Sequence, residues 1–85
     1  MEKINVLVVD DEEINLDLLE EIIRDDDVKV YKAKSGVEAL KISTKREYAA
    51  IIIDVNMPLM DGYDLAKLLK KESKVKDIPI IFITA

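Results

Sequence analysis

Cysteine and histidine are both absent from this chain of 85 residues. Without cysteine there is no disulfide framework and no thiolate metal site, so a reducing compartment such as the cytoplasm is the expected location. Without histidine the chain offers no imidazole as a general base, as a nucleophile or as a phosphohistidine. No apolar run approaches the ~20 residues of a membrane span and the start lacks a signal-peptide pattern, so we expect no membrane association.

The balance of apolar and charged residues indicates one small globular domain over residues 1–85. Hydrophobic residues make up 49% of the chain and charged residues 36%, which is too apolar a mixture for a disordered segment. The 18 acidic residues outnumber the 13 basic ones and give a net charge of −5. Because an acidic surface repels phosphate groups, we expect neither nucleic acid nor an anionic membrane as a partner.

Strand and helix patterns alternate along the sequence. Short Val- and Ile-rich runs are typical of strands buried in a parallel sheet, whereas apolar residues at a spacing of three or four indicate helices. The predicted strands are residues 4–9, 28–33, 49–53 and 80–84. The predicted helices are residues 13–24, 36–44 and 62–72, the first with Leu18, Leu19, Ile22 and Ile23 on one side, and the second opened by a capping box of Ser35 and Glu38. The order of the elements predicts an α/β fold.

The second predicted strand carries Lys29 and Lys32, which are typical of a half-exposed strand at the edge of a sheet. Right-handed crossovers then favour a flavodoxin-like, doubly wound parallel sheet with the strand order 2-1-3-4. In this order the first and third strands are neighbours, at the point where the chain reverses direction.

Three aspartates follow these two neighbouring strands. Asp10 and Asp11 come directly after the first strand, and Asp54 comes directly after the third. Ligands of such sheets bind at the carboxyl ends of the strands, so we expect the three carboxylates to meet there. They would raise one another's pKa unless a cation neutralised them, which predicts a metal site. For Asp11 alone, capping of the following helix is an equally good interpretation, whereas Asp61 is better placed than Asp54 to cap the third helix.

In these stretches the sequence resembles the receiver domain of two-component response regulators. The resemblance rests on the paired acids in residues 8–12, on the Asp-x-x-Met-Pro-x-Met-Asp-Gly loop in residues 53–62, and on the Thr-Ala ending of residues 79–85. It covers the whole chain. It implies a phosphoacceptor signalling module rather than an enzyme in the ordinary sense.

The resemblance also implies a role for individual residues. Asp54 would accept a phosphoryl group from the phosphohistidine of a histidine kinase, which is the implied partner. Mg²⁺ would bind to the carboxylates of Asp10, Asp11 and Asp54 and to the backbone carbonyl of Asn56. Thr84 would contact the phosphoryl oxygens and carry the switch.

The chain also departs from the family pattern of five strands and five helices. The resemblance implies a receiver truncated after its fourth strand, without the fourth helix, the fifth strand, the fifth helix and the lysine that pairs with the phosphoryl group. The remaining helices would leave alternate residues of the third and fourth strands bare. An uncharged edge strand invites pairing, so we expect a homodimer or higher assembly through Ile80–Ile83.

Two other functions are consistent with parts of the pattern. A pseudo-receiver would bind a partner without being phosphorylated, and the missing lysine keeps this alternative open. A phosphohydrolase of the haloacid dehalogenase type also uses a strand-end aspartate and Mg²⁺, but it requires a second acid where this chain has Asn56. A flavin or dinucleotide site is disfavoured because no Gly-rich loop follows the first strand.

Overall fold

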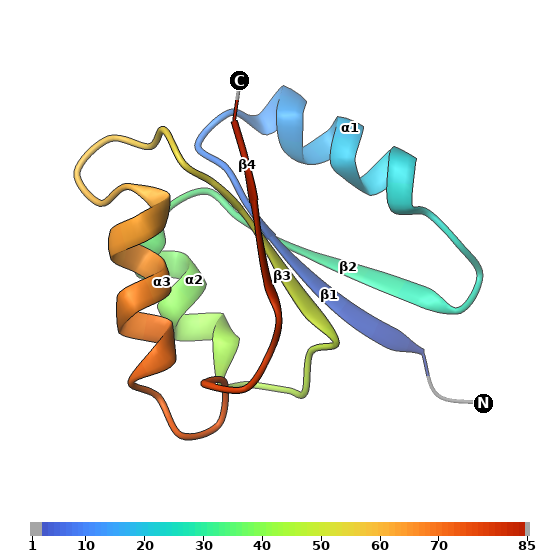
Figure 1. The fold of residues 1–85 in the computed structure, drawn as a ribbon. Helices are drawn as coiled ribbons and strands as arrows, with labels where there is room; N and C mark the ends of the chain where they lie inside the picture. The colour runs from blue at the N-terminus through green and yellow to red at the C-terminus, as the bar shows by residue number, and fades with distance from the viewer. Residues whose placement is uncertain (1–2, 85) are drawn as a thin grey trace.

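Four parallel strands form a twisted sheet with helices on both faces in the computed structural model, which describes residues 3–84 (Figure 1). The strands are β1 (Ile4–Val9), β2 (Val28–Ala33), β3 (Ala50–Asp54) and β4 (Ile80–Ile83). The helices are α1 (Glu13–Ile23), α2 (Gly36–Ser43) and α3 (Gly62–Lys70). Hydrogen bonds order the strands β2-β1-β3-β4, and every neighbouring pair is parallel. The predicted α/β fold and strand order are therefore confirmed.

Side-chain caps begin two of the helices. The hydroxyl of Ser35 accepts a hydrogen bond of 3.1 Å from the N–H of Glu38, and the carboxylate of Asp61 accepts one of 2.9 Å from the N–H of Asp64. Both caps satisfy N–H groups that a helix start leaves without a partner. The carboxylate of Glu38 reaches back to the N–H of Lys34 at 3.3 Å, one residue before the expected partner.

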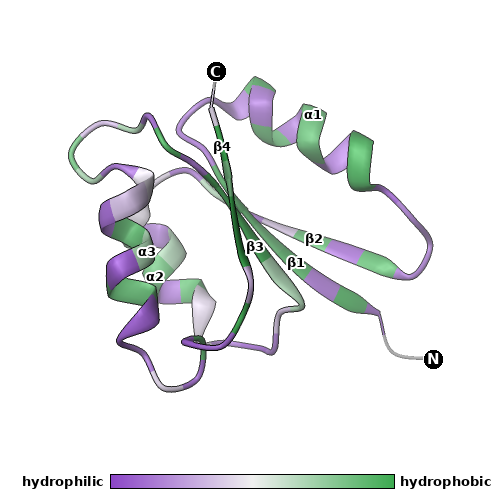
Figure 2. Ribbon diagram, viewed as in Figure 1, coloured by the Kyte–Doolittle hydropathy of each residue, from purple (hydrophilic) through white to green (hydrophobic). Residues whose placement is uncertain are grey.

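The alternation of side chains along β1 and β3 divides the hydrophobic core into two layers. Leu7 and Val9 point to the face covered by α2 and α3, whereas Val8 points to the face covered by α1 (Figure 1). Hydrophobic residues accordingly run almost without interruption along the central strands (Figure 2). These central strands are the rigid base on which their carboxyl-terminal residues are held. No helix within residues 3–84 has the length and apolar character needed to cross a membrane.

Helix α1 packs on the sheet through only part of its apolar surface. Leu16 is buried against the sheet and Leu19 and Ile23 are partly buried, whereas Leu18 and Ile22 are exposed. The predicted apolar side of the helix is thus only partly covered, with Leu19 and Ile23 against the sheet and Leu18 and Ile22 at its open edge. A spacing of three and four residues, starting at Leu16, puts one stripe of the apolar helix against β1 and β3.

Among the described residues of the sheet, large apolar side chains are exposed on β4 and at Ile4, the first residue of β1. The prediction that residues of β3 would be bare is wrong, because Ile51 and Ile53 are fully buried and Ile52 packs with Val8 and Leu16. On β4, the expected exposure is found at Ile81 and Phe82. A single helix thus covers more of its face than its width suggests, because the twist of the sheet brings the central strands beneath it.

Gly62 allows α3 to begin in contact with the backbone that carries Asp54. A Cβ atom at this position would collide with the carbonyl oxygen of Asp54 and lie 2.9 Å from the Cα of Val55. We expect Gly62→Ala to lower the free energy of unfolding by about 1–3 kcal/mol, because backbone atoms cannot move aside. Alanine's higher helix propensity opposes this loss and will not offset it. Chemical denaturation measures the change.

Gly36→Ala is the matched control for this prediction. The Cβ atom it adds would meet the sulfur of Met60, the far end of a flexible side chain that can shift. We therefore expect a smaller loss of stability than for Gly62→Ala. Equal losses in the two variants would contradict the account of the start of α3.

Candidate functional site

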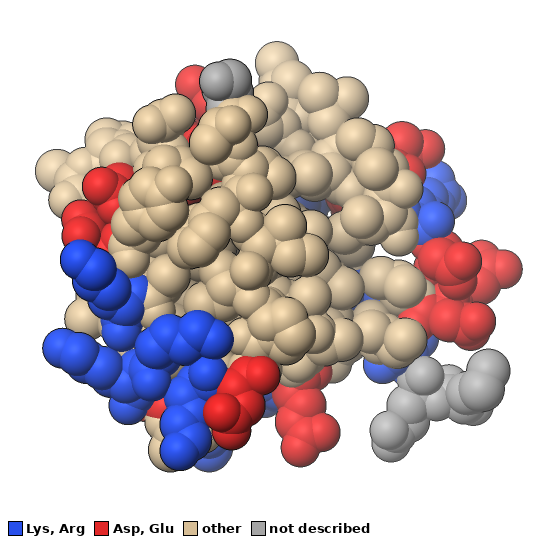
Figure 3. Space-filling view, viewed as in Figure 1, with Lys and Arg blue, Asp and Glu red and all other residues tan. Residues whose placement is uncertain are grey.

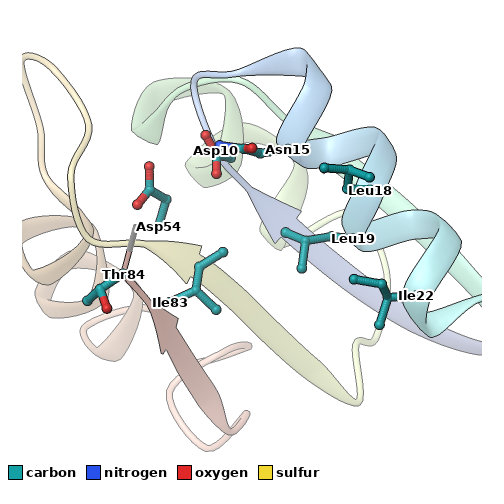
Figure 4. Close-up of a pocket in the computed structure, with 8 residues that line it drawn as sticks. All are labelled: Asp10, Asn15, Leu18, Leu19, Ile22, Asp54, Ile83 and Thr84. Carbon is teal, nitrogen blue, oxygen red and sulfur yellow. The ribbon is translucent and has the colours of Figure 1, made fainter.

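Three aspartates converge at the carboxyl ends of β1 and β3. Val9 is paired with Ile53 in the sheet, so the residues that follow each of them, Asp10 and Asp54, lie side by side. Carboxylate oxygens of Asp10, Asp11 and Asp54 all lie within 4.8 Å of one another. Figure 4 shows Asp10 and Asp54 at the same end of the sheet, on neighbouring strands. The structure thus brings together the three carboxylates that the sequence placed at strand ends.

Short local hydrogen bonds orient two of these carboxylates. The N–H of Glu12 donates to Oδ1 of Asp10 at 2.9 Å, and the N–H of Asn56 donates to Oδ1 of Asp54 at 3.1 Å. Asp10 is only 1% exposed and Asp54 only 7% exposed, whereas Asp11 is open to solvent. The cluster is therefore a preformed acidic site that is open to solvent at Asp11.

Burial raises the pKa of Asp10 above its ordinary value of 3.8, and the neighbouring charges of Asp54 and Asp11 raise it further. Hydrogen bonds from the N–H of Glu12 and from the side chain of Asn15 act in the opposite direction and do not cancel the effect of burial. Keeping Asp10 ionised therefore costs free energy, and a bound cation would offset that cost. Three carboxylates are hard oxygen donors and fit Mg²⁺ or Ca²⁺.

Helix capping does not account for these acids. The N-cap position of α1 is occupied by Glu12, so the capping interpretation of Asp11 is wrong. The predicted capping of α3 by Asp61 is confirmed, and it leaves Asp54 at the end of β3 without that role. Asp54 is therefore a buried, strand-terminal carboxylate that helix capping does not explain.

Thr84 follows β4 and shares a cavity with the two buried aspartates (Figure 4). The cavity has a volume of about 240 Å³ and lies between α1 and the ends of β3 and β4. Asn56 lies in the loop after β3 and is exposed, with its backbone N–H already bonded to Asp54. The structure thus places both residues next to Asp54, while their roles stay predictions.

Sequence reasoning missed Asn15, which lines the same cavity. It lies on α1 next to Asp10, and Leu18, Leu19 and Ile22 of the same helix also line the cavity (Figure 4). The amide of Asn15 lies next to Asp10 and favours its ionised form. A polar residue one helical turn after the paired acids was the available signal in the sequence.

The loop between β3 and α3 is anchored at one methionine and exposed at its tip. Met57 is buried in the core, whereas Leu59 is fully exposed with a left-handed φ of 69°. Its backbone conformation is rare for a leucine and is held by the neighbouring turn, in which the N–H of Met60 donates to the carbonyl of Pro58 at 2.7 Å. The loop thus carries Asn56 on a defined path between Asp54 and the start of α3.

The family model and the similar proteins of known sequence point to the same family. The response regulator receiver domain matches residues 6–85. The polar-differentiation response regulator DivK of Brucella ovis is 30% identical over 81 residues, which cover 95% of this chain and 66% of DivK. A probable transcriptional regulator of Porphyra purpurea, ycf29, is 35% identical over 81 residues, which cover 95% of this chain and 39% of that protein.

Solved structures agree with this result. The chemotaxis protein CheY4 of Vibrio cholerae superposes with a TM-score of 0.88 at 34% identity, over 94% of this chain and 67% of CheY4. The receiver domain of a signal transduction histidine kinase from Syntrophus aciditrophicus gives a TM-score of 0.84 at 31% identity, over 94% of this chain and 61% of that one. This chain therefore spans from about two fifths to two thirds of the length of these proteins.

The raised pKa of Asp10 predicts a pH-dependent stability in the absence of metal. Above pH 3.8 the folded protein holds this proton more tightly than the unfolded chain, so this carboxyl lowers stability as the pH rises through the range above 3.8. We expect Asp10→Asn to melt at a higher temperature than the parent chain at about pH 7 in a chelator. The difference should shrink as the pH falls toward about 4.

Thermal unfolding followed by circular dichroism measures this difference. Asp77→Asn makes the same change of charge at an exposed position outside the cluster and serves as the control. Its melting temperature should stay close to that of the parent chain. A gain for Asp10→Asn that is absent near neutral pH, or that grows in acid, would contradict the assignment of Asp10 to a repulsive cluster.

Proposed function

Because the chain belongs to the response regulator receiver domain family, we propose that it accepts a phosphoryl group on Asp54 in two-component signalling. One observation carries the proposal. Asp54 is a nearly buried carboxylate at the end of β3, beside two further carboxylates and on the wall of a cavity of about 240 Å³. With a cation bound to the carboxylates, this arrangement could admit one small anion and hold it against a nucleophilic oxygen.

The donor supplies the histidine that this chain lacks. We propose a histidine kinase as the partner, because receiver domains interact with such kinases. One carboxylate oxygen of Asp54 attacks the phosphorus atom and forms the new O–P bond, while the P–N bond to the donor's imidazole breaks. The imidazole leaves with the electron pair and takes a proton from solvent. The product is an aspartyl phosphate on β3.

Mg²⁺ is the cation that fits this reaction best. It binds through one or two carboxylates together with water and substrate oxygens, and the cluster offers hard oxygen donors of this kind. Asp10, Asp11, Asp54 and the backbone carbonyl of Asn56 would hold it. When bound, the ion neutralises the negative charges that otherwise keep a carboxylate and a phosphoryl group apart.

Thr84 is the proposed switch residue. Its position after β4, on the cavity shared with Asp54, lets its hydroxyl contact a phosphoryl oxygen attached to Asp54. A hydroxyl that moves toward the phosphoryl group would pull the end of β4 with it. The change at Asp54 would thereby reach the exposed surface of β4.

The location of the chain and its other partners are part of the proposal. We propose that the chain acts in the cytoplasm, that it binds neither nucleic acid nor membrane through this domain, and that it self-associates through Ile80–Ile83. Exposed Ile81 and Phe82 on this strand support the last point. Burial of apolar surface of this kind stabilises an assembly by about 25 cal/mol per Å².

Phosphorylation is tested with Mg²⁺ and a small acyl phosphate as the donor. We expect the parent chain to gain the mass of one phosphoryl group in an adduct that is stable in acid and labile in base, as an acyl phosphate should be. Asp54→Asn should give no adduct, because it lacks the nucleophilic oxygen. Intact-protein mass spectrometry measures both.

Asp61→Asn is the matched control, since it changes the cap of α3 in the same loop and should still be labelled. Labelling that survives in Asp54→Asn would move the acceptor to another residue. A parent chain that takes no phosphoryl group from either an acyl phosphate or a phosphorylated kinase domain would instead favour the pseudo-receiver function.

A further inference from the structure

The first turn of α1 holds the carboxylate of Asp10, and one of its two donors there is the side chain of Asn15. The N–H of Glu12, at the N-cap of the helix, donates to Oδ1 of Asp10 at 2.9 Å. The side-chain amide of Asn15 donates a second hydrogen bond to the same carboxylate. Figure 4 shows this amide beside Asp10. The two donors are three residues apart, so a single helical turn supplies both.

The packing of α1 fixes the place of the Asn15 side chain. Leu16, the next residue, is only 1% exposed and packs with Val8 and Ile52 of the sheet. Its N–H donates to the carbonyl of Glu12 at 3.2 Å and so closes the first turn of the helix. Because the buried leucine sets the rotation of this turn, the half-buried Asn15 is directed at Asp10 before any cation binds.

Hydrogen bonds, and not ion pairs, orient Asp10 within residues 3–84. The charged groups that act on it are Asp54 and Asp11, which are both acidic. Figure 3 shows the largest group of basic side chains gathered over the end of α3 and the segment that follows it, away from the carboxyl ends of the strands. The carboxylate of Asp54 accepts from the N–H of Asn56 at 3.1 Å, and Asp11 is open to solvent. Asp10 is thus the carboxylate of the cluster that a neighbouring side chain holds.

We propose that Asn15 is a positioning residue, which keeps the carboxylate of Asp10 in the orientation that a bound Mg²⁺ requires. This inference rests on the cation site of the proposed function and adds a residue of α1 to it. Asn15 acts through Asp10 and does not bind the ion itself. A side chain that hydrogen-bonds a metal ligand fixes the orientation of that ligand, and loss of such a partner weakens metal binding by about 10–100-fold.

A neutral amide suits this position better than a charged side chain. A further carboxylate beside Asp10 would add to the repulsion within the cluster, and an ammonium group would put a positive charge where the cation binds. The amide of Asn15 donates its N–H without changing the charge of the site. The negative charge of the three aspartates therefore remains available to the cation.

Asn15→Leu tests the proposal, because leucine is close to asparagine in size and lacks the amide. Isothermal titration calorimetry at about pH 7 should give a Kd for Mg²⁺ that is about tenfold or more above that of the parent chain. Asn15→Gln keeps an amide donor on a longer stem and should bind Mg²⁺ more tightly than Asn15→Leu. Asn15→Ala also lacks the amide, introduces a strong helix former and should show the same loss as Asn15→Leu.

Asn5→Leu is the matched control. The amide of Asn5, near the opposite end of β1, donates to the carbonyl of Glu47 at 3.0 Å. The same substitution therefore removes an amide hydrogen bond outside the cluster, and the Kd for Mg²⁺ should equal that of the parent chain. Asp10→Asn gives a second comparison, because it removes the carboxylate that Asn15 holds. Adding Asn15→Leu to Asp10→Asn should cause no further loss of affinity, since the two residues act as one unit.

Several outcomes would overturn the positioning role. An unchanged Kd in Asn15→Leu would do so, as would an equal loss in Asn5→Leu or a further tenfold loss when Asn15→Leu is added to Asp10→Asn. A parent chain that binds no Mg²⁺ would overturn the cation site and this inference with it. Circular dichroism shows whether each variant is folded, and Asn15→Ala decides the matter if Asn15→Leu is not.

Phosphorylation by an acyl phosphate separates this inference from the proposed function. Asn15→Leu should need more Mg²⁺ than the parent chain but reach the same rate of labelling when Mg²⁺ saturates, because Asp54 keeps its nucleophilic oxygen. A rate that stays low at saturating Mg²⁺ would overturn a role through the cation site alone. A parent chain that binds Mg²⁺, with the expected loss in Asn15→Leu, but takes no phosphoryl group would support the positioning role and contradict the phosphoacceptor function.

Discussion

The parallel pairing of β1 with β3 is the constraint on which the site depends. It fixes Val9 beside Ile53, and the next residues of both strands are then forced to be neighbours. Three carboxylates therefore lie within 4.8 Å of one another in a largely buried setting. The raised pKa of Asp10 indicates that keeping this carboxylate ionised there costs free energy. Two fully buried layers of side chains hold the strands in this register. The core thus stabilises a site that is itself unfavourable without a cation.

The features that sequence reasoning predicted are those that short segments determine by themselves. Continuous apolar runs identified the strands, lysines identified the edge strand, and the caps at Ser35 and Asp61 located two helix starts. Strand order then followed from the handedness of crossovers. The three aspartates directly follow two buried strands. Their convergence could therefore be predicted once the order of the strands in the sheet was known.

The features that it missed depend on how elements rotate and cover one another. Helix α1 is apolar over more than one stripe, so its sequence alone did not distinguish a buried Leu16 from an exposed Leu18. Coverage of β3 depends on the twist of the sheet, which no local pattern encodes. The sequence alone could not predict that Asn15 lines the cavity, because this depends on the position of α1 beside Asp10.

The dependence of stability on Mg²⁺ tests the central claim most directly. If the three carboxylates form one cation site, Mg²⁺ at ten times its Kd should stabilise the fold by about 1.4 kcal/mol and raise the melting temperature. Asp11→Ala should melt higher than the parent chain without metal, because repulsion is relieved, and should no longer respond to Mg²⁺. A parent chain with a melting curve that is unchanged by millimolar Mg²⁺ would contradict the assembled site.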